Sequence, residues 1–373
     1  MDAARASGTA ADQAEALLNL AYAHRTDGGF DVARDLLRHA LDGYREVGDK
    51  LGEANVRCEL GRISHLINEH ARAATEHELA LALYRELGDR LGEADALYEL
   101  SRVYALIGRF EDAAQLAAEA LFAFQELGKP IGVAQVRIVL ADLRQRAGAF
   151  DEAAELLKRS VAIFRETRSR QDEADALGTL GRIRLAQGRY EDAAELLERT
   201  LTLCREDGTR HGIAAALGVL GSVRLAQGET AAATDLLRES IAIFQAIGDR
   251  IGAATVQQHL ARARHRGGDD GPALDLLNAA IAAFEQSGDR SALGGAWNIK
   301  GGLLLDIEGA DAALPWYRKA LTIAREVGAD ALRAEALEGV ARCLAEAEPV
   351  DPLVGRAEEL LAEFSKTDNG AVT

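Results

Sequence analysis

Residues 181–201, GRIRLAQGRYEDAAELLERTL, contain the signals that decide the fold. A segment in which small and apolar residues alternate with polar ones stops at Gly188, and Glu191 and Asp192 follow where a second helix would begin. Glycine readily adopts the left-handed backbone that ends helices, and carboxylates complement the positive end of a helix. The stretch therefore predicts two helices joined by a tight turn around Gly188.

The same pattern returns every forty residues. One series of turn glycines, broken by Arg168, contains Gly48, Gly88, Gly128, Gly208, Gly248, Gly288 and Gly328. A second series lies midway between them and contains Gly28, Gly108, Gly148, Gly188, Gly228 and Gly268, with Asn68 in the second repeat and Gly309 one place late in the eighth. Two turn signals per forty residues predict two helices of about sixteen to eighteen residues in each repeat.

Apolar residues recur between these turns at helical spacing. The first helices share a leucine at Leu20, Leu60, Leu100, Leu140, Leu180, Leu220 and Leu260, followed by a small residue that allows close helix approach. The second helices share an aromatic residue at Tyr44, Tyr84, Phe124, Phe164, Phe244 and Phe284. Because a helix pair of this size cannot bury its apolar face alone, neighbouring pairs must stack. The sequence predicts an all-α solenoid.

Composition and charge exclude several classes of function. The formal charge of −17 opposes binding to nucleic acid and to anionic membranes, which require a cationic surface. No apolar run reaches the roughly 18 residues of a membrane span, and residues 1–20 lack the pattern of a signal peptide. Arginine supplies almost all of the basic charge, as in proteins of GC-rich bacteria. We expect a bacterial, cytoplasmic protein that binds neither nucleic acid nor membrane.

The repeats also predict the domain organisation. We expect a flexible N-terminal segment at 1–10, a solenoid at 11–366 whose last repeat is degenerate, and a disordered tail at 367–373. The ninth repeat would place its second helix at 352–366, and the sequence leaves open that further domains precede the solenoid in a longer parent chain. Repeat four has no glycine from Arg165 to Ala174, so we expect its second helix to run on and bend the superhelix.

These residues resemble the tetratricopeptide repeat. Residues 181–201 are the clearest copy, residues 101–121, SRVYALIGRFEDAAQLAAEAL, are nearly as good, and the match covers about 10–366. The junction LGDRLGEADAL at 87–97 resembles the forty-residue variant found in kinesin light chains and in MalT-like sensor regions of bacterial STAND-class and SARP-type regulators. The resemblance implies a right-handed superhelix of about nine helix pairs. Of a STAND-class regulator only the sensor part would be present, because the sequence lacks a GxxxxGK[ST] motif.

The resemblance also places a binding groove along the first helices. In a forty-residue frame that starts at residue 1, positions 15, 18, 22 and 25 lie on one helix face. Glu59, Glu99 and Arg342 belong to this face or lie beside it. The residues predicted to form a peptide-binding groove are Asn19, Tyr22, Arg62, Tyr98, Arg102, Arg182, His259, Arg262 and Asn298.

The groove arginines allow two interpretations. The pairs Glu59–Arg62, Glu99–Arg102 and Glu338–Arg342 have the spacing of salt bridges within one helix. Alternatively, some arginines receive carboxylates from a bound chain, which suits their planar, forked guanidinium groups. Arg182 and Arg262 have no acidic residue within one turn before them, so we expect them to bind an acidic or C-terminal segment of a partner protein that crosses repeats five to seven.

The sequence therefore predicts a protein- or peptide-binding scaffold rather than an enzyme. Such a scaffold could be the sensor module of a transcriptional regulator. A structural oligomerisation module and a ligand-binding or enzymatic solenoid are the alternatives. Paired acids such as Glu191 and Asp192 are explained as helix caps. Cys58, Cys204 and Cys343 are too far apart for a CxxC site and are predicted to be packing residues. We expect no metal and no cofactor.

Overall fold

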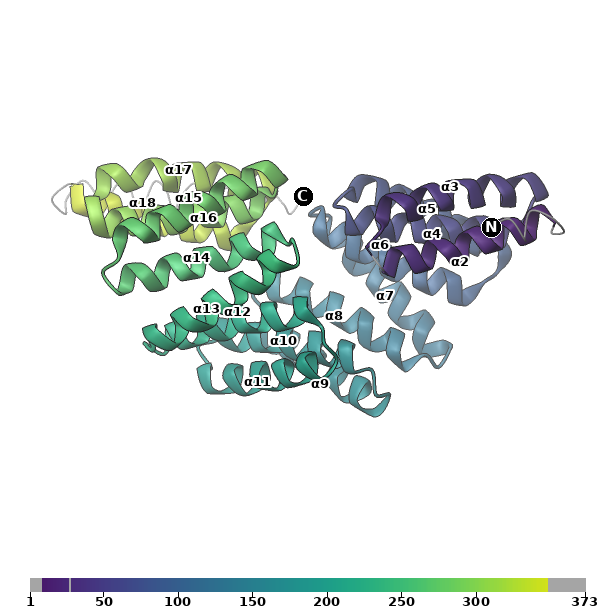
Figure 1. Cartoon of the computed structure of the whole chain (residues 1–373), viewed down its shortest axis with the longest axis horizontal. Helices are drawn as coiled ribbons and strands as arrows, with labels where there is room; N and C mark the ends of the chain where they lie inside the picture. The colour runs from purple at the N-terminus through teal and green to yellow at the C-terminus, as the bar shows by residue number, and fades with distance from the viewer. Residues whose placement is uncertain (1–8, 27, 348–373) are drawn as a thin grey trace, which may run out of the picture. The chain divides into compact units, whose positions relative to one another are not determined.

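The computed structural model describes residues 9–26 and 28–347, in which every regular element is an α-helix (Figure 1). Repeats one to four consist of α2 (Ala10–Thr26) and α3 (Phe30–Val47), α4 (Lys50–Leu66) and α5 (His70–Leu87), α6 (Arg90–Leu106) and α7 (Phe110–Glu126), and α8 (Pro130–Arg146) and α9 (Phe150–Glu166). Repeats five to eight consist of α10 (Arg170–Ala186) and α11 (Tyr190–Glu206), α12 (Arg210–Ala226) and α13 (Thr230–Ala246), α14 (Arg250–Arg266) and α15 (Asp270–Ser287), and α16 (Arg290–Glu308) and α17 (Ala310–Val327). The first helix of repeat nine is α18 (Asp330–Ala347).

The predicted all-α solenoid is confirmed, since helix pairs follow one another in the forty-residue frame. The expected second helix at 352–366 and the tail at 367–373 lie outside the described residues, as does most of the segment at 1–10. The domain boundaries stay predictions there.

The turns arise where the glycines predict them. Gly48, after α3, has a φ of 72°, and its N–H donates to the carbonyl of Arg45. Positive φ angles recur at both glycine series, and Asn68 has a φ of 62°. Asparagine tolerates this conformation better than most residues because its short polar side chain can bond locally. The left-handed turns predicted between helices are therefore confirmed.

The prediction that the second helix of repeat four runs on is wrong. α9 ends at Glu166, and Arg168 itself adopts the left-handed conformation with a φ of 58°. The N–H of Ser169 donates to the carbonyl of Phe164 at 2.9 Å, as Asp49 donates to Tyr44 at the turn after α3. Because the local hydrogen bonds are the same, the chain turns here although the glycine is absent.

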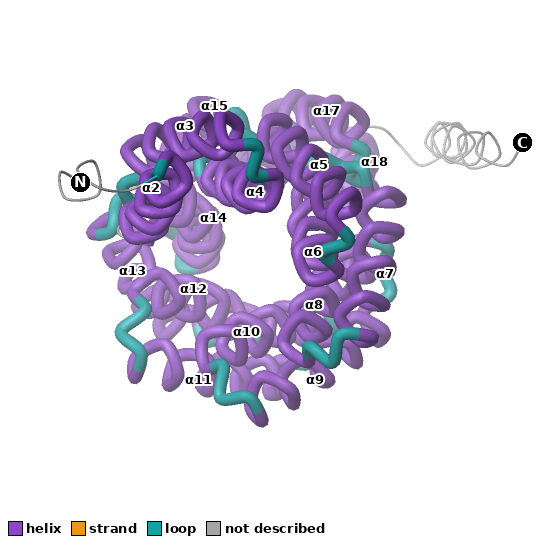
Figure 2. Tube along the Cα trace, turned by 90° about the vertical axis from the view of Figure 1, so that its right-hand side faces the viewer, coloured by secondary structure: helices purple, strands orange, loops and turns teal. Residues whose placement is uncertain are grey.

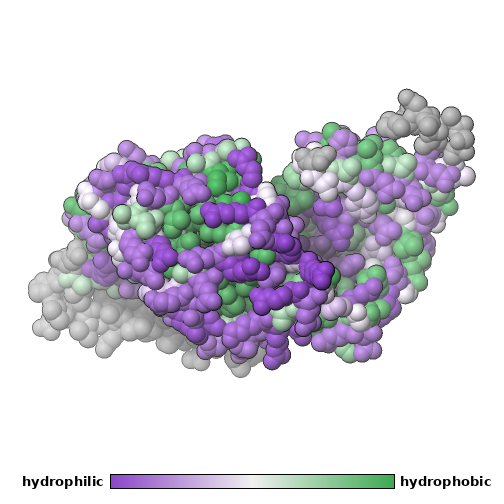
Figure 3. Space-filling view, turned by 60° about the horizontal axis from the view of Figure 1, so that its bottom comes forward, coloured by the Kyte–Doolittle hydropathy of each residue, from purple (hydrophilic) through white to green (hydrophobic). Residues whose placement is uncertain are grey.

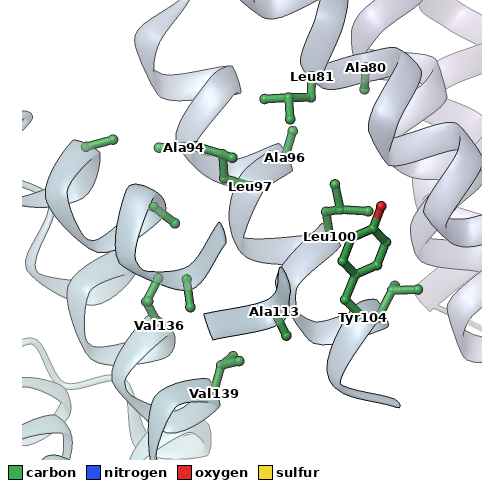
Figure 4. Packing of buried hydrophobic residues seen from close by; sticks show 14 of the residues in the cluster. Ala80, Leu81, Ala94, Ala96, Leu97, Leu100, Tyr104, Ala113, Val136 and Val139 are labelled. Atoms are coloured by element: carbon green, nitrogen blue, oxygen red, sulfur yellow. The ribbon is translucent and has the colours of Figure 1, made fainter. Parts of the chain in front are cut away.

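The contacts divide the chain into two compact units, Met1–Ala176 and Leu177–Thr373, with the boundary inside α10. In the first unit one core cluster contains residues of α4 to α8, and a second contains residues of α2, α3 and α4. Figure 4 shows Leu97, Leu100 and Tyr104 of α6 together with Val136 and Val139 of α8 among the buried residues of the first cluster. In the second unit the largest fully buried side chains are Ile183, Leu197, Leu217, Leu237, Leu277 and Phe284.

Small residues permit the close packing within a repeat. A Cβ atom at Gly181 would lie 2.9 Å from Cγ of Leu197, and one at Gly221 would lie 2.7 Å from Cγ of Leu237. The predicted role of the small residue after the repeated leucine is confirmed at these positions. All three cysteines are buried, as expected of packing residues: Cys58, Cys204 and Cys343.

Each unit has a layer of first helices and a layer of second helices. Figure 2 shows α4, α6 and α8 in one layer of the first unit and α5, α7 and α9 in the other, while α12 and α14 of the second unit are layered against α13 and α15. The outer surface is mostly hydrophilic on the face seen in Figure 3, with hydrophobic residues in smaller groups. The predicted groove residues all belong to the first-helix layer.

Candidate functional site

The first-helix face of the first unit carries a continuous chain of ion pairs. Nε of Arg25 lies 3.0 Å from Oε2 of Glu59, whose other oxygen accepts a hydrogen bond from Arg62. Nε of Arg62 donates to Oε1 of Glu99 at 2.9 Å. Arg102 donates to Oε2 of Glu99, also at 2.9 Å. This ion-pair chain links α2, α4 and α6 across two repeat boundaries.

The surroundings of this chain favour the charged form of Glu99. Burial opposes ionisation of Glu99, but Arg102 and Arg62 outweigh burial and hold the pKa of Glu99 below its usual value. Burial first and Arg102 second lower the pKa of His65 to about 4, and Nε2 of this histidine lies 3.3 Å from Arg102. The Arg102 guanidinium also lies 5.6 Å from the ring centre of Tyr98. Arg62, Tyr98 and Arg102 are thus brought together, and both arginines are neutralised by the protein's own acids.

Tyr22 and Asn19 lie at the α2 end of this face. Tyr22 is half-buried, and burial first and Glu59 second raise the pKa of its hydroxyl. Asn19 is exposed. Tyr22 therefore adjoins the ion-pair chain, whereas Asn19 presents its amide to solvent.

The first-helix face of the second unit differs, because Arg262 of α14 forms no ion pair or hydrogen bond with any residue in 9–26 or 28–347. Its side chain keeps contact with solvent, yet many protein atoms surround it. Partial loss of water around the guanidinium first, and the nearby Arg266 second, lower the pKa of Arg262, while Glu335 of α18 opposes the shift. One turn earlier lies His259, whose pKa is lowered to about 4, first by loss of water around its ring and second by Arg262. Arg266 donates to the carbonyl of Leu225 at 2.6 Å. A neutral histidine and two cationic arginines thus share one side of α14.

Two further predicted residues lie elsewhere in the second unit. Arg182 is exposed on α10 and donates to Oγ1 of Thr179 at 3.1 Å, a local hydroxyl partner that was not predicted from the sequence. Asn298 is buried, and its Nδ2 donates to the carbonyl of Leu332 at 3.3 Å. Its Oδ1 is shielded from solvent and accepts no hydrogen bond from the described part of the chain. Asn298 therefore connects α16 to α18.

The predicted pairing of Arg342 with Glu338 is wrong. The guanidinium of Arg342 lies 3.5 Å from Oδ1 of Asp306 on α16, because stacking brings the first helices of successive repeats together. Arg25 and Arg266 are not among the groove residues predicted from the sequence. Arg25 occupies position 25 of the predicted face and could have been found by that signal, whereas Arg266 lies one place beyond it.

Within residues 9–26 and 28–347, no group of three or more His, Cys, Asp or Glu side chains is arranged to hold a metal ion. None of the described helices is both long and apolar enough to cross a lipid bilayer.

Comparison with known structures identifies the fold. Aspartyl phosphate phosphatase F from Bacillus subtilis is 15% identical with a TM-score of 0.63, covering 77% of this chain and 75% of that chain. The apo form of RapI is 13% identical with a TM-score of 0.61, covering 74% of this chain and 99% of that chain. The Rap conjugation gene regulator of plasmid pLS20, in complex with the Phr* peptide, is 15% identical with a TM-score of 0.61, covering 74% of this chain and 75% of that chain. At these identities the likeness shows the fold alone.

The sequence itself identifies the family. None of the curated proteins matches the chain. The family model described as tetratricopeptide repeat matches residues 12–86, 132–206 and 212–286, which together make up more than half of the chain. The chain belongs to the tetratricopeptide repeat family.

Proposed function

We propose that this protein is a binding scaffold and that the first-helix face of its second unit binds an extended acidic or C-terminal segment of a partner protein. The observation that carries the proposal is the contrast between equivalent arginines. Arg62 and Arg102 are paired with buried carboxylates, whereas Arg262, at the same position of the repeat, has no acidic partner within the described residues. Arg262 therefore has its donors available for a carboxylate from outside.

The chemistry of this face suits a carboxylate. A guanidinium group can donate two parallel hydrogen bonds to one carboxylate, which adds directional specificity to the charge attraction. Neutral His259, one turn earlier, offers one donor and one acceptor without adding positive charge. Arg266, one turn later, extends the positive potential along α14. An extended peptide could thus bind through one carboxylate and several backbone groups.

The related folds support a peptide as the class of ligand. The Rap conjugation gene regulator was solved in complex with the Phr* peptide, and a Rap protein was solved with the competence and sporulation factor. We extend this to the present chain as a proposal, in which the scaffold acts as the sensor module of a bacterial transcriptional regulator in the cytoplasm. Binding, rather than catalysis, is then the proposed activity.

The test begins with a displayed library of random peptides with free C-termini, selected against the wild-type protein. Enriched peptides are measured by calorimetry against Arg182→Ala with Arg262→Ala. We expect the enriched peptides to bind through acidic side chains or through a free C-terminal carboxylate. Their binding to the double variant should be weaker than to the wild-type protein by about 1–3 kcal/mol.

The matched control is Arg199→Ala with Arg238→Ala, which also removes two positive charges, but from the exposed sides of α11 and α13. We expect this control to bind like wild type. If both double variants lose affinity equally, net charge rather than the α14 face determines binding, and an unchanged affinity in the first variant would contradict the proposal outright.

A further inference from the structure

Both tryptophans of the chain meet two lysines in repeat eight. Nζ of Lys300 lies 3.7 Å from the ring centre of Trp316, and Nζ of Lys319 lies 4.3 Å from the same centre. Lys319 also lies 5.6 Å from the ring centre of Trp297. All three distances are within the range of about 6 Å for attraction between a cation and an aromatic face. We call these four residues the Trp–Lys cluster.

The repeats show that this cluster is a departure from the common pattern. Lys300 occupies the position of the leucine that the seven preceding repeats share, for example Leu220 and Leu260, which are 5% exposed. Trp316 likewise replaces a residue that is leucine in repeat seven, Leu276. The packing that serves the other repeats needs neither an ammonium group nor an indole here. Trp316 still packs against the buried residues of this repeat, but an ammonium group in place of the shared leucine adds nothing to core packing and indicates a further role for Lys300.

The two ammonium groups of the cluster have no acidic partner in the part of the chain that the structure describes. Within the described residues neither lysine forms an ion pair, and Lys300 donates its hydrogen bond to the neutral Oδ1 of Asn278 on α15 at 2.6 Å. On the same helix pair, Arg290 of α16 is paired with Glu326 of α17. Acidic residues are abundant in a chain of formal charge −17. Because neither lysine is ion-paired within residues 9–26 and 28–347, the cluster is a local positive site on an acidic protein.

Two further observations point to a missing acceptor. Burial first and the neighbouring Lys319 second lower the pKa of Lys300, so the charged form of Lys300 is disfavoured in these surroundings. Nε1 of Trp297 is shielded from solvent and donates to no acceptor in the described part of the chain. Buried donors normally have partners. An incoming anion would relieve the repulsion between the lysines.

The cluster is separate from the face around Arg262. Lys300 occupies position 20 of the repeat and the groove arginines occupy position 22, and two residues correspond to about 200° around an α-helix. The contacts of Lys300 with Trp316 on α17 and Asn278 on α15 place it toward the second-helix layer. Lys319 is exposed and Trp316 partly so, which makes the cluster accessible from that side.

We propose that the Trp–Lys cluster is a second binding surface, which binds glutamate or aspartate side chains of an acidic protein segment. The carboxylates would lie between the two ammonium groups, and the indole faces would pack against the methylene groups of the bound side chains. Carboxylate binding here is independent of the function proposed for the α14 face.

The cluster can be tested by its own fluorescence, because both tryptophans of the protein belong to it. An acetylated, amidated hexaglutamate peptide is titrated into the full chain, with hexaglutamine as the uncharged control. We expect a saturable change with hexaglutamate alone. In Lys300→Leu with Lys319→Gln the affinity, also measured by calorimetry, should fall about tenfold or more because both charge-assisted contacts are lost. The leucine restores the residue of the other repeats, so this variant should fold.

Two control variants separate the possible outcomes. Lys50→Gln with Lys158→Gln removes two exposed lysines from the first unit and should bind hexaglutamate like wild type. Arg182→Ala with Arg262→Ala should also bind like wild type, which distinguishes this proposal from the previous one. The proposal is overturned if the lysine variant of the cluster binds normally, if hexaglutamine binds equally well, or if inorganic phosphate competes at the same concentration as the peptide.

Discussion

Arg168 adopts a left-handed backbone that is unfavourable for an arginine. This conformation costs an L-residue roughly 1–2 kcal/mol, whereas a glycine loses about 0.5–1 kcal/mol through its greater freedom in the unfolded chain. We expect Arg168→Gly to raise the free energy of unfolding by about 0.5–1 kcal/mol, as measured by urea denaturation. Asn68→Gly is the control, and its gain should be smaller because asparagine tolerates a φ of 62°. A less stable Arg168→Gly protein would contradict this account of the turn.

His77 is fully buried beside Cys58, at a position where Leu37 and Leu157 stand in other repeats. Burial lowers its pKa from 6.5 to about 4, so between these two pH values the histidine is protonated in the unfolded chain and neutral in the folded chain. Stability should therefore be lost as the pH falls below about 6.5, by roughly 2 kcal/mol between pH 7 and pH 5. His77→Leu should lose less stability than wild type over this interval in denaturation at the two pH values. Equal losses would assign the acid sensitivity to other groups.

The turn residues show what local sequence can predict. The turn glycines and Asn68 predict a left-handed turn because they adopt this conformation readily, and the turns lie where they were expected. Arg168 has no such preference, so only the hydrogen bonds and packing of the flanking helices determine its backbone. His77 is similar, because nothing in its neighbouring sequence indicates that Gly61 leaves room for its ring.

At the scale of elements, the ion-pair chain should couple α2, α4 and α6 energetically. Glu59 is 2% exposed, and its removal leaves Arg25 and Arg62 without their shared carboxylate. We expect Glu59→Ala to cost about 1–3 kcal/mol of stability. Since Glu59 and Glu99 share Arg62, their double-mutant cycle should give a coupling energy of about 0.5–3 kcal/mol.

The control for this cycle is Asp142→Ala, which removes an exposed acid paired with Arg146 of its own helix and should change stability by less than about 1 kcal/mol. Additive losses for Glu59 and Glu99 would show that the ion pairs act one by one rather than as a chain.

Contacts between elements are the part of the candidate site that sequence predicts least well. Spacing within one helix correctly pairs Glu59 with Arg62, and the same rule fails for Arg342 because Asp306 of the preceding first helix competes for it. The choice depends on how the helices stack, which a spacing rule does not contain. The sequence predicts that Arg262 has no acid within one turn before it, whereas the lack of an acid from any other described helix and the position of Arg266 beside it required the structure.

At the scale of the whole molecule, contacts join helices that are neighbours in the stack. Stability in such a fold is close to a sum of repeat and interface terms. We expect residues 1–288, which end at the turn after α15, to remain folded and helical by circular dichroism but to melt at a lower temperature. Residues 1–259, which end inside α14, should be less soluble because the cut exposes core residues. Loss of all helicity in the 1–288 protein would contradict the modular interpretation.

The forty-residue period was sufficient to predict the number and order of the described helices. It could not predict the division into two units at Ala176, since α10 has the same length and the same leucine as other first helices. The period describes what the repeats share, whereas this division and the Trp–Lys cluster arise from what they do not share.

The regular turns also affect how the gene can change. An in-frame loss of the codons for residues 50–89 would join Asp49 to Arg90, so that one aspartate cap would replace another at the start of α6. Arg25 would then face Glu99, which occupies the same repeat position as the carboxylate that it pairs with now. Recombination between repeats could therefore shorten or lengthen the protein by whole units and leave both the turn and the charge pairing intact at the new junction.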